Sequence, residues 1–468
     1  MGDSLIGTPC KRCKVEPTVV ESRNDNFCKQ CFIRFIRGKQ RKHMNDEKFR
    51  AKYGKDPVEI DSRTPRVLLS LSIGKSSLVL LDVVFSLLLE QSKMPRSHIG
   101  FKLTIAIIDD SDLFTLDSNN KLTPLKYIEL IKQFYGDEFL NDLDINFKII
   151  NSNNFTLNSN DLQKKIKINK DYEAVTNDAD NGIMSSNDLI NQFSHLSTRE
   201  DFSQIIVREL VLRTAVSLNC NVVLFGHSMT KLAVDVLALT VRGRGSEINS
   251  QLNDGIVKFC GTDIEIIHPL RDVLETEINS YCDQADLNKL LQSDESGDTQ
   301  VKIKKSSKNK TISEMSKEYF QDVEITYPEV ISTVVKIGSK LTTPQIDEES
   351  FNATQNDGTF RNCVVCYQPI YVNIKNWLEQ ITVLDSAPVV TEEEKENLQN
   401  YLNLPISNID SIDSNNSHSV MESVCYGCLV DLGEKSGQPF TWPIRRPTKE
   451  EILKEFILTD EEDEDDEE

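Results

Sequence analysis

The sequence predicts an α/β protein with a parallel sheet, helices on both faces and a small cysteine-rich module at each end. Two observations lead to this prediction. Apolar, strand-like runs alternate with helix-like segments through the middle of the chain, and eight of the eleven cysteines form four Cys-x-x-Cys pairs. Alternating strands and helices are typical of parallel sheets, because the crossover helices cover both faces. A chain of 468 residues is long enough for two or three domains.

The charge and composition exclude several classes of protein. The net charge of −21 argues against a simple nucleic-acid binder, although nine of those charges lie in the run Asp460–Glu468 and the remainder carries −12. Such a block is typical of a disordered tail, which we place at residues 448–468. The chain has neither an 18-residue apolar run nor an apolar signal region. We therefore expect a soluble, cytoplasmic protein without membrane contact.

Residues 1–33 are predicted to form a zinc knuckle. Two Cys-x-x-Cys pairs separated by fourteen residues supply four thiolates, the preferred ligands of structural zinc, and the segment is too short to fold by apolar burial alone. A disulfide framework is not expected in an intracellular chain. A redox dithiol, an iron–sulfur site or unligated thiols are the alternatives. The predicted ligands are Cys10, Cys13, Cys28 and Cys31.

Residues 34–62 are predicted to form a basic helix and a linker. Nine lysines and arginines lie between positions 34 and 55, against few acids. Such side chains supply most sequence-independent affinity for nucleic acid, so this basic segment is a candidate phosphate-binding surface. The alternative is a solvated helix face that keeps the linker soluble. The candidate contacts are Arg34, Arg37, Lys39, Arg41 and Lys42.

The main α/β domain is predicted at residues 63–341, and its first unit is a strand, a turn and a buried helix between Arg66 and Gln91. The turn Ser72–Ser77 contains Gly-Lys-Ser, but Leu69 stands where a Walker P-loop requires glycine. Backbone N–H groups of such a turn, with the helix N-terminus behind it, form an anion cradle. An ordinary strand-to-helix turn is the alternative.

This turn resembles the PP-loop of adenine-nucleotide alpha hydrolases, a strand ending in Ser-Gly-Gly-x-Asp-Ser before a helix. Ser72, Gly74 and Ser77 match that pattern, whereas Ile73 replaces the first glycine and Ser76 replaces the aspartate. Isoleucine restricts the backbone where glycine allows close approach to a phosphate. The resemblance therefore predicts a degenerate nucleotide pocket.

The rest of this domain continues the alternation. Strands are predicted at 103–109, 145–151 and 221–225, and helices at 123–140, 201–217, 231–241 and 312–341, with a polar insertion at about 151–187. His227 follows the strand at 221–225, at the edge of the sheet where ligands bind, and is added to the candidate pocket. A helix-capping turn is the alternative role. Cys220 and Cys282 are interpreted as small core residues.

A second cysteine module is predicted at residues 363–447, after a linker at 342–362. Its two Cys-x-x-Cys pairs are separated by 58 residues, and loop closure over that length is permissible because its cost grows only logarithmically. We interpret Cys363, Cys366, Cys425 and Cys428 as a second structural zinc site. The alternative is that each pair combines with the N-terminal knuckle.

Taken together, these features resemble the cytoplasmic tRNA 2-thiolation protein 2 family over most of the chain. The most specific stretches are VESRNDNFCKQCF (20–32), GKQRKHM (38–44), SLVLLDVV (77–84), LLLEQSK (87–93), FGHSMTKLA (225–233), VRGRGSEI (241–248), HPLRDVLETEI (268–278) and CYGCL (425–429).

The resemblance implies a role in 2-thiolation of the wobble uridine in cytosolic tRNAs for Lys, Glu and Gln. It also implies a heterodimer with a catalytic PP-loop thiolase subunit, which binds ATP and magnesium and adenylates the uridine. Sulfur is then expected from a thiocarboxylated ubiquitin-related modifier. The candidate tRNA contacts are the five basic residues of 34–42, together with Arg242 and Arg244.

The chain departs from the catalytic relatives, which implies a subunit that is not an enzyme by itself. Those relatives carry a Cys-x-x-Cys pair where Asp201 to Ile205 contain no cysteine, and acids where Gly226–Thr230 reads Gly-His-Ser-Met-Thr. Two other functions stay open. The chain could itself adenylate and thiolate, with Cys282 accepting sulfur and Ser72, Gly74, Ser77 and His227 holding phosphates. Alternatively, it is a zinc-dependent adaptor whose acidic tail recruits a basic protein.

Overall fold

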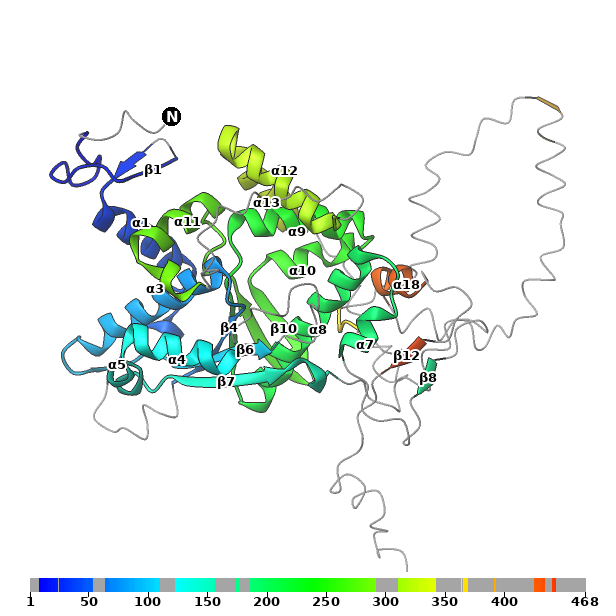
Figure 1. Ribbon diagram of the computed structural model, residues 1–468, viewed down its shortest axis with the longest axis horizontal. Helices are drawn as coiled ribbons and strands as arrows, with labels where there is room; N and C mark the ends of the chain where they lie inside the picture. Colours follow the sequence, from blue (N-terminus) through cyan, green and yellow to red (C-terminus); the bar gives the residue numbers. More distant parts are fainter. Residues whose placement is uncertain are drawn as a thin grey trace, which may run out of the picture.

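The computed structural model describes residues 8–53 without 24, 64–109, 123–155, 174–176, 186–291, 310–341, 363–368 without 364, 391–392, 395, 425–433 and 440–442 (Figure 1). The predicted acidic tail, the linker at 342–362 and most of the insertion at 151–187 lie outside these residues. Within them, no helix is long and apolar enough to cross a membrane.

A six-stranded sheet forms the centre of the molecule (Figure 1). The predicted parallel sheet is confirmed, because five strands are parallel and only the edge strand β10 is antiparallel. Strand order changes direction between β4 and β9, which is where ligands bind in open α/β sheets. In spatial order the strands are β10 (Gly255–Phe259), β11 (Thr262–Ile267), β9 (Val222–Phe225), β4 (Arg66–Leu71), β6 (Lys102–Asp109) and β7 (Asn146–Asn151).

Helices cover both faces of the sheet, as the alternation predicted. Side chains alternate along β4, so that Val67 and Leu69 belong to one apolar cluster and Leu68 to another. The first cluster packs beneath α3 (Lys75–Ser92), α4 (Pro124–Tyr135) and α11 (Glu275–Gln284). The second packs beneath α7 (Ser186–Asn191) and α8 (Leu196–Ser217).

Two predicted helices are each divided into two. Gly136, with φ of 91°, separates α4 from α5 (Asp137–Asp142) inside the predicted span 123–140. Pro328 begins a new helix, which splits the predicted span 312–341 into α12 (Ile312–Thr326) and α13 (Pro328–Lys340). Proline lacks the N–H that a continuous helix requires but fits a first helical turn, so a break at this position is favoured.

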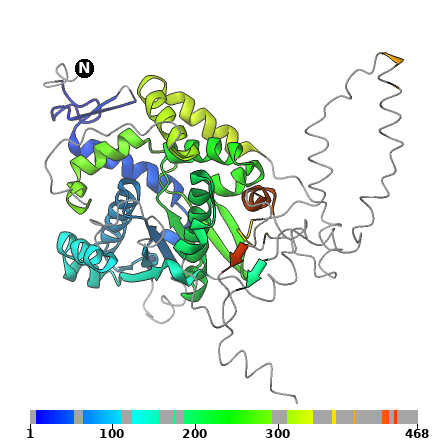
Figure 2. The same cartoon turned by 45° about the vertical axis from the view of Figure 1, so that its right-hand side comes forward.

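A third apolar cluster lies at one end of the sheet, where α12 and α13 pack on α9 (Met229–Val241) and α10 (Ile248–Leu252). Ser228 caps α9 by accepting from the backbone N–H of Lys231. In Figures 1 and 2 this helical group lies above the central sheet.

The N-terminal unit consists of a hairpin and a helix. Strands β1 (Val20–Ser22) and β2 (Asp25–Phe27) precede α1 (Lys29–His43), so the predicted boundary between residues 33 and 34 falls inside a helix. The remaining short elements are η1 (Glu47–Phe49), β3 (Lys52–Tyr53), β5 (Ser97–His98), η3 (Ser152–Asn154), β8 (Ala174–Thr176), η4 (Gly245–Glu247), η5 (Leu287–Leu290), α18 (Tyr426–Gly433) and β12 (Phe440–Trp442).

Candidate functional site

The four N-terminal cysteines lie together. Their sulfurs are all within 4.8 Å of one another, and the Sγ atoms of Cys13 and Cys28 are 3.8 Å apart. A tetrahedral zinc ion with Zn–S bonds of about 2.3 Å requires sulfurs roughly 3.8 Å apart, so the donor set fits such a metal. Cys28 directly precedes α1, where the positive end of the helix dipole stabilises thiolates.

The four C-terminal cysteines also form one set. Their sulfurs lie within 4.8 Å of one another, and the Sγ atoms of Cys366 and Cys425 are 3.5 Å apart. The alternative in which each pair combines with the N-terminal knuckle is therefore wrong. Cys425 directly precedes α18, so this set also includes a pair at a helix N-terminus. The geometry again fits one tetrahedral metal.

A buried arginine, Arg244, lies against the C-terminal set. Its side chain is only 1% exposed, and its Nη2 atom lies 3.5 Å from the Sγ atom of Cys428 and 2.6 Å from a carboxylate oxygen of Asp431. Its other nitrogens donate to Asp201 at 2.5 Å and to Glu247 at 2.9 Å. Burial alone would lower the pKa of Arg244, but Cys428 and the surrounding carboxylates raise it well above its ordinary value.

Glycine permits this close approach. A Cβ atom added to Gly427 would lie 2.4 Å from Cγ of Arg244, so the Gly in the Cys-x-Gly-Cys turn makes room for the guanidinium. Gly243 has φ of 75°, and a Cβ atom there would meet the ring of Tyr426 at 3.0 Å. Gly427 and Gly243, which lack a Cβ atom, thus allow α18 to pack closely against the segment that carries Arg244.

Arg242 is buried in the same network. It donates to Asp201 and Glu200, each at 2.9 Å, and to Ser313 at 2.7 Å. The prediction that Arg242 and Arg244 contact tRNA does not fit this placement, because both guanidinium groups are buried among carboxylates. Sequence reasoning interpreted them as surface cations, since their partners lie far away in the chain.

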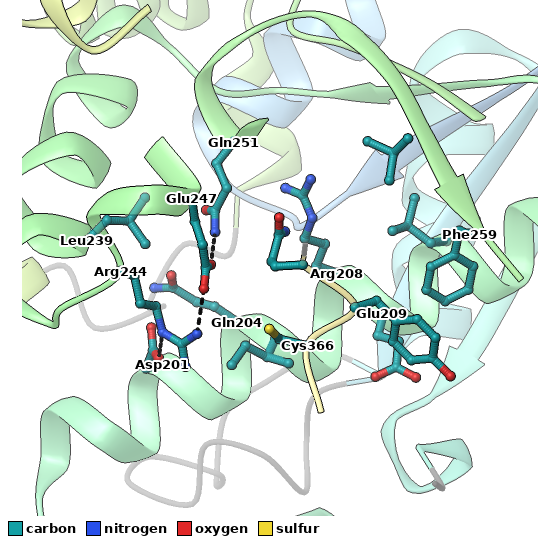
Figure 3. A pocket seen from close by; sticks show the side chains of 15 residues that line it. Asp201, Gln204, Arg208, Glu209, Leu239, Arg244, Glu247, Gln251, Phe259 and Cys366 are labelled. Carbon is teal, nitrogen blue, oxygen red and sulfur yellow. Dashed lines mark hydrogen bonds and ion pairs between the residues drawn. The ribbon is translucent and has the colours of Figure 1, made fainter. Parts of the chain in front are cut away.

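A cavity of about 50 Å³ lies next to Cys366 and the Arg244 network (Figure 3). Arg208 and Glu209 of α8 line it together with Gln251. Burial raises the pKa of Glu209 to about 7 and lowers that of Arg208, which lies near Glu247. The sequence contained no signal for this cavity, because α8 and the cysteine pair meet only in the fold.

The predicted phosphate loop follows β4 at the point where strand order reverses. Ile73 has φ of 61°, so the backbone keeps a conformation that favours glycine although a β-branched residue occupies it. Ser77 donates to the carbonyl of Gly74 at 2.8 Å, and the Oγ atoms of Ser72 and Ser77 are 3.3 Å apart. The loop thus retains its backbone shape, while Ser76 supplies a hydroxyl in place of the aspartate carboxylate.

Gly226 brings the end of β9 against this loop. A Cβ atom added there would lie 2.8 Å from Cα of Ser77, so only glycine allows the two segments to pack. The next residue, His227, stacks on His268 with ring centroids 5.2 Å apart, and its buried Nδ1 atom has no hydrogen-bond partner among the described residues. Burial and the nearby His268 lower the pKa of His227, which favours a neutral ring.

His268 is a site residue that sequence reasoning missed. It is fully buried, and its Nδ1 atom lies 3.1 Å from a carboxylate oxygen of Asp254. Within the part of the chain that the structure describes, its Nε2 atom has no hydrogen-bond partner. The signal for it was the stretch beginning His-Pro-Leu-Arg, which follows β11 at the same edge of the sheet.

The three cysteines outside the pairs are not arranged for sulfur transfer. Cys282 is fully buried, and its Sγ atom lies 3.9 Å from the carbonyl of Lys75. Burial raises its pKa to about 12, so the thiolate is disfavoured. Cys220 is buried as expected, and Cys260 lies exposed in the turn between β10 and β11.

Most of the predicted RNA-contacting side chains of α1 are paired with carboxylates of the α/β domain. Lys39 donates to Glu277 at 2.6 Å, Lys42 donates to Asp272 at 2.9 Å, and Arg41 pairs with Glu90. Arg37 lies 3.8 Å from Asp82. Arg34 is exposed, and no ion pair to it occurs within the described residues. The paired side chains fasten α1 to the domain.

Comparisons with known proteins give a consistent result. A family model described as Cytoplasmic tRNA 2-thiolation protein 2 matches residues 311–430. Proteins of that name from Scheffersomyces stipitis and Debaryomyces hansenii are each 40% identical to the chain, over 97% of its length and 97% and 96% of theirs.

A solved structure, the U34-tRNA thiolase NcsA from Methanococcus maripaludis with its [4Fe-4S] cluster, is 14% identical over 81% of this chain and 98% of that one, with a TM-score of 0.46. That score is too low to support an argument about function. The close relatives over nearly the whole chain establish the assignment: the protein belongs to the cytoplasmic tRNA 2-thiolation protein 2 family.

Proposed function

We propose that this chain is the non-catalytic subunit of a heterodimeric tRNA thiolase. In this proposal it is required in the cytoplasm for 2-thiolation of the wobble uridine in tRNAs for Lys, Glu and Gln. The catalytic PP-loop subunit holds ATP and magnesium, and a thiocarboxylated ubiquitin-related modifier supplies sulfur. Membership of the tRNA 2-thiolation family supports the pathway.

The observation that carries the non-catalytic assignment is the phosphate loop, which keeps its backbone but lacks reactive side chains. Ile73 holds the left-handed conformation, yet Ser76 stands at the aspartate position, and Gly226–Thr230 keeps the Gly-His of the catalytic relatives without their acids. Magnesium requires oxygen ligands, usually carboxylates, and sulfur transfer requires an accessible thiolate. The loop offers no carboxylate, and Cys282 behind it is buried.

Both cysteine sets are proposed to hold structural zinc. Each offers four sulfurs and no open position, which is the arrangement of closed structural sites rather than catalytic ones. The N-terminal set stabilises the unit that carries α1, and the C-terminal set stabilises the Arg244 network. Neither set is therefore assigned a role in the thiolation chemistry.

The test is rescue of wobble 2-thiouridine in cells that lack this chain. Gly74→Asp places a carboxylate at the mouth of the cradle, where a Cβ atom meets nothing closer than Oγ of Ser72 at 3.7 Å. Aspartate and asparagine are both good residues at this N-cap position, so Gly74→Asn is a matched, uncharged control.

The proposal expects both variants to restore 2-thiouridine, measured by mass spectrometry of digested tRNA, to the level of the intact chain. Loss of thiolation with Gly74→Asp but not Gly74→Asn would show that the loop still binds a phosphate, and would contradict the non-catalytic assignment. Release of pyrophosphate from ATP by the purified chain and tRNA, without the partner, would contradict it as well.

A further inference from the structure

A second groove lies beside the degenerate loop, at the same edge of the sheet. It encloses about 260 Å³ between α13 and the segments that follow β9 and β11. Met229, the first residue of α9, lines it and donates its backbone N–H to the carbonyl of Val273 at 2.7 Å. The groove therefore occupies the carboxyl ends of two parallel strands, where open α/β sheets bind ligands.

Three of the eight residues that line this groove are cationic, and one is acidic. Lys336 and Lys340 lie one turn apart on α13 and are exposed, and neither has an ion pair within the described part of the chain. Arg271 donates to Oγ of Ser339 at 3.2 Å and lies 3.6 Å from Asp254. A lysine in the last turn stabilises a helix dipole, which accounts for Lys340 but not for Lys336.

The one acid in the groove is already paired. Asp272 accepts from Nζ of Lys42 and lies at the same distance, 2.9 Å, from Nε2 of His43. These partners pull the pKa of Asp272 well below its usual range, His43 most strongly, so the carboxylate is ionised at neutral pH. Lys42, at the end of α1, therefore offsets the one carboxylate that lines the groove.

The groove contrasts with the rest of the basic segment. Arg37, Lys39 and Arg41 are engaged by acids of the α/β domain, whereas Lys336 and Lys340 are not. Lysine, arginine and serine side chains are among the groups that contact nucleic-acid phosphates. The two lysines can each neutralise a phosphate without first losing an ion pair, whereas Arg271 already lies 3.6 Å from Asp254.

We propose that this groove binds the phosphodiester backbone of RNA, with Lys336 and Lys340 as the principal contacts. The inference deepens the proposed function, on which it rests, by naming where the tRNA contacts this subunit. RNA bound here would lie across the carboxyl edge of the sheet, next to the loop Ser72–Ser77.

The test measures binding of a fluorescent tRNA Lys transcript to the full chain by anisotropy over a series of salt concentrations. Lys336→Glu with Lys340→Glu should weaken binding about tenfold or more at 100 mM salt. It should also make the dependence of log Kd on log salt shallower by about 2, since each lost phosphate contact removes close to one unit. The double variant Lys336→Arg with Lys340→Arg retains both positive charges, so it should keep the wild-type Kd and the wild-type salt dependence.

The matched control is Lys126→Glu with Lys132→Glu. These lysines are exposed on α4, which lies at the other end of the molecule in both ribbon views, and the charge change is the same. Unchanged melting temperatures check that both double variants are folded.

Three results would overturn the groove. The first is an equal loss of tRNA affinity in the Lys336→Glu, Lys340→Glu variant and in the control. The second is wild-type affinity and wild-type salt dependence in that variant. The third is no measurable tRNA binding by the wild-type chain. Binding of a synthetic Asp460–Glu468 peptide in place of RNA would assign the groove to an acidic protein segment instead. The thiolation rescue remains a separate measurement, so the proposed function can survive the loss of this groove.

Discussion

The two cysteine sets are built alike but sit in different surroundings. The backbone N–H of Cys10 donates to the carbonyl of Glu16, and that of Cys363 donates to the carbonyl of Gln368. The carbonyl of each of these cysteines accepts from the backbone N–H of the residue four positions later. That later residue, Lys14 or Tyr367, has a positive φ in both cases. The second pair of each set then begins a helix.

The difference lies in what contacts the sulfurs. Around the N-terminal set, Phe27 and Phe35 stack at 5.1 Å, and Arg12 lies over their rings rather than at the sulfurs. At the C-terminal set, Arg244 reaches Cys425 and Cys428, and the four cysteines belong to or pack against the apolar cluster beneath α8. One motif can therefore support either a peripheral unit or the main domain, depending on its neighbours.

Loss of a ligand should separate the two sets most clearly. Cys428→Ser should remove one equivalent of metal and lower the melting temperature of the whole chain by roughly 10 °C, because Arg244 loses its sulfur partners. Cys28→Ser should also remove one equivalent but unfold mainly the N-terminal unit, leaving the main transition in place. Elemental analysis and calorimetry measure both effects. Equal shifts in the main transition would remove the distinction between the sets.

Removing the cation should give the next largest effect. Arg244→Met keeps the approximate length of the side chain but removes the guanidinium partner of Glu247 and Asp431, while Arg242 stays paired with Asp201, at a cost of about 3–5 kcal/mol. The matched change Arg12→Met should cost less than about 1 kcal/mol, because only an exposed contact with aromatic rings is lost. Urea denaturation gives both free energies. A cost below 1 kcal/mol for Arg244→Met would show that the network is not a source of stability.

The free energy of unfolding should also depend on pH through a group beside the C-terminal cysteine set, with a smaller effect than the two changes above. The pKa of Glu209, which lines the cavity next to Cys366, is raised to about 7 by burial. The folded state favours the protonated form of Glu209. The stability that this group contributes to the fold is therefore fully present below about pH 4.5 and is lost as pH rises through about 7.

Glu209→Gln should therefore become more stable than the wild type as pH rises across that window, by on the order of 2 kcal/mol. Urea denaturation at several pH values measures the difference. Metal analysis at each pH checks that both proteins remain fully loaded. A difference that does not change with pH would show that the ion pair with Arg213 offsets the effect of burial and keeps the carboxylate charged.

The sequence predicted the parallel strands well because four of them, β4, β6, β7 and β9, carry strong apolar runs. The hairpin of β10 and β11 was missed, since polar residues such as Lys258, Asp263 and Glu265 interrupt its apolar pattern. The break at Pro328 carried a local signal that was not used. The grouping of four cysteines could be predicted from spacing alone at the N-terminus, where the two pairs are close.

The site residues that sequence reasoning misassigned depend on distant partners. Arg244 resembles a surface cation in a glycine-rich stretch, and only the fold brings Asp201 and Asp431 to it. The same holds for the groove, where Lys336 and Arg271 come from separate segments. Local patterns predict which residues are charged, but they do not predict whether a charge is already paired.

The Arg244 network also constrains the order in which the chain matures. Asp431, which completes the network, is synthesised 187 residues after Arg244, and Cys425 and Cys428 are made shortly before it. A ribosome therefore releases the whole parallel sheet before the last partners of this buried cation exist. The domain therefore reaches its final packing only after residue 431 has been translated. Loading of the zinc proposed for the C-terminal cysteine set is then expected to be a late step in its biogenesis.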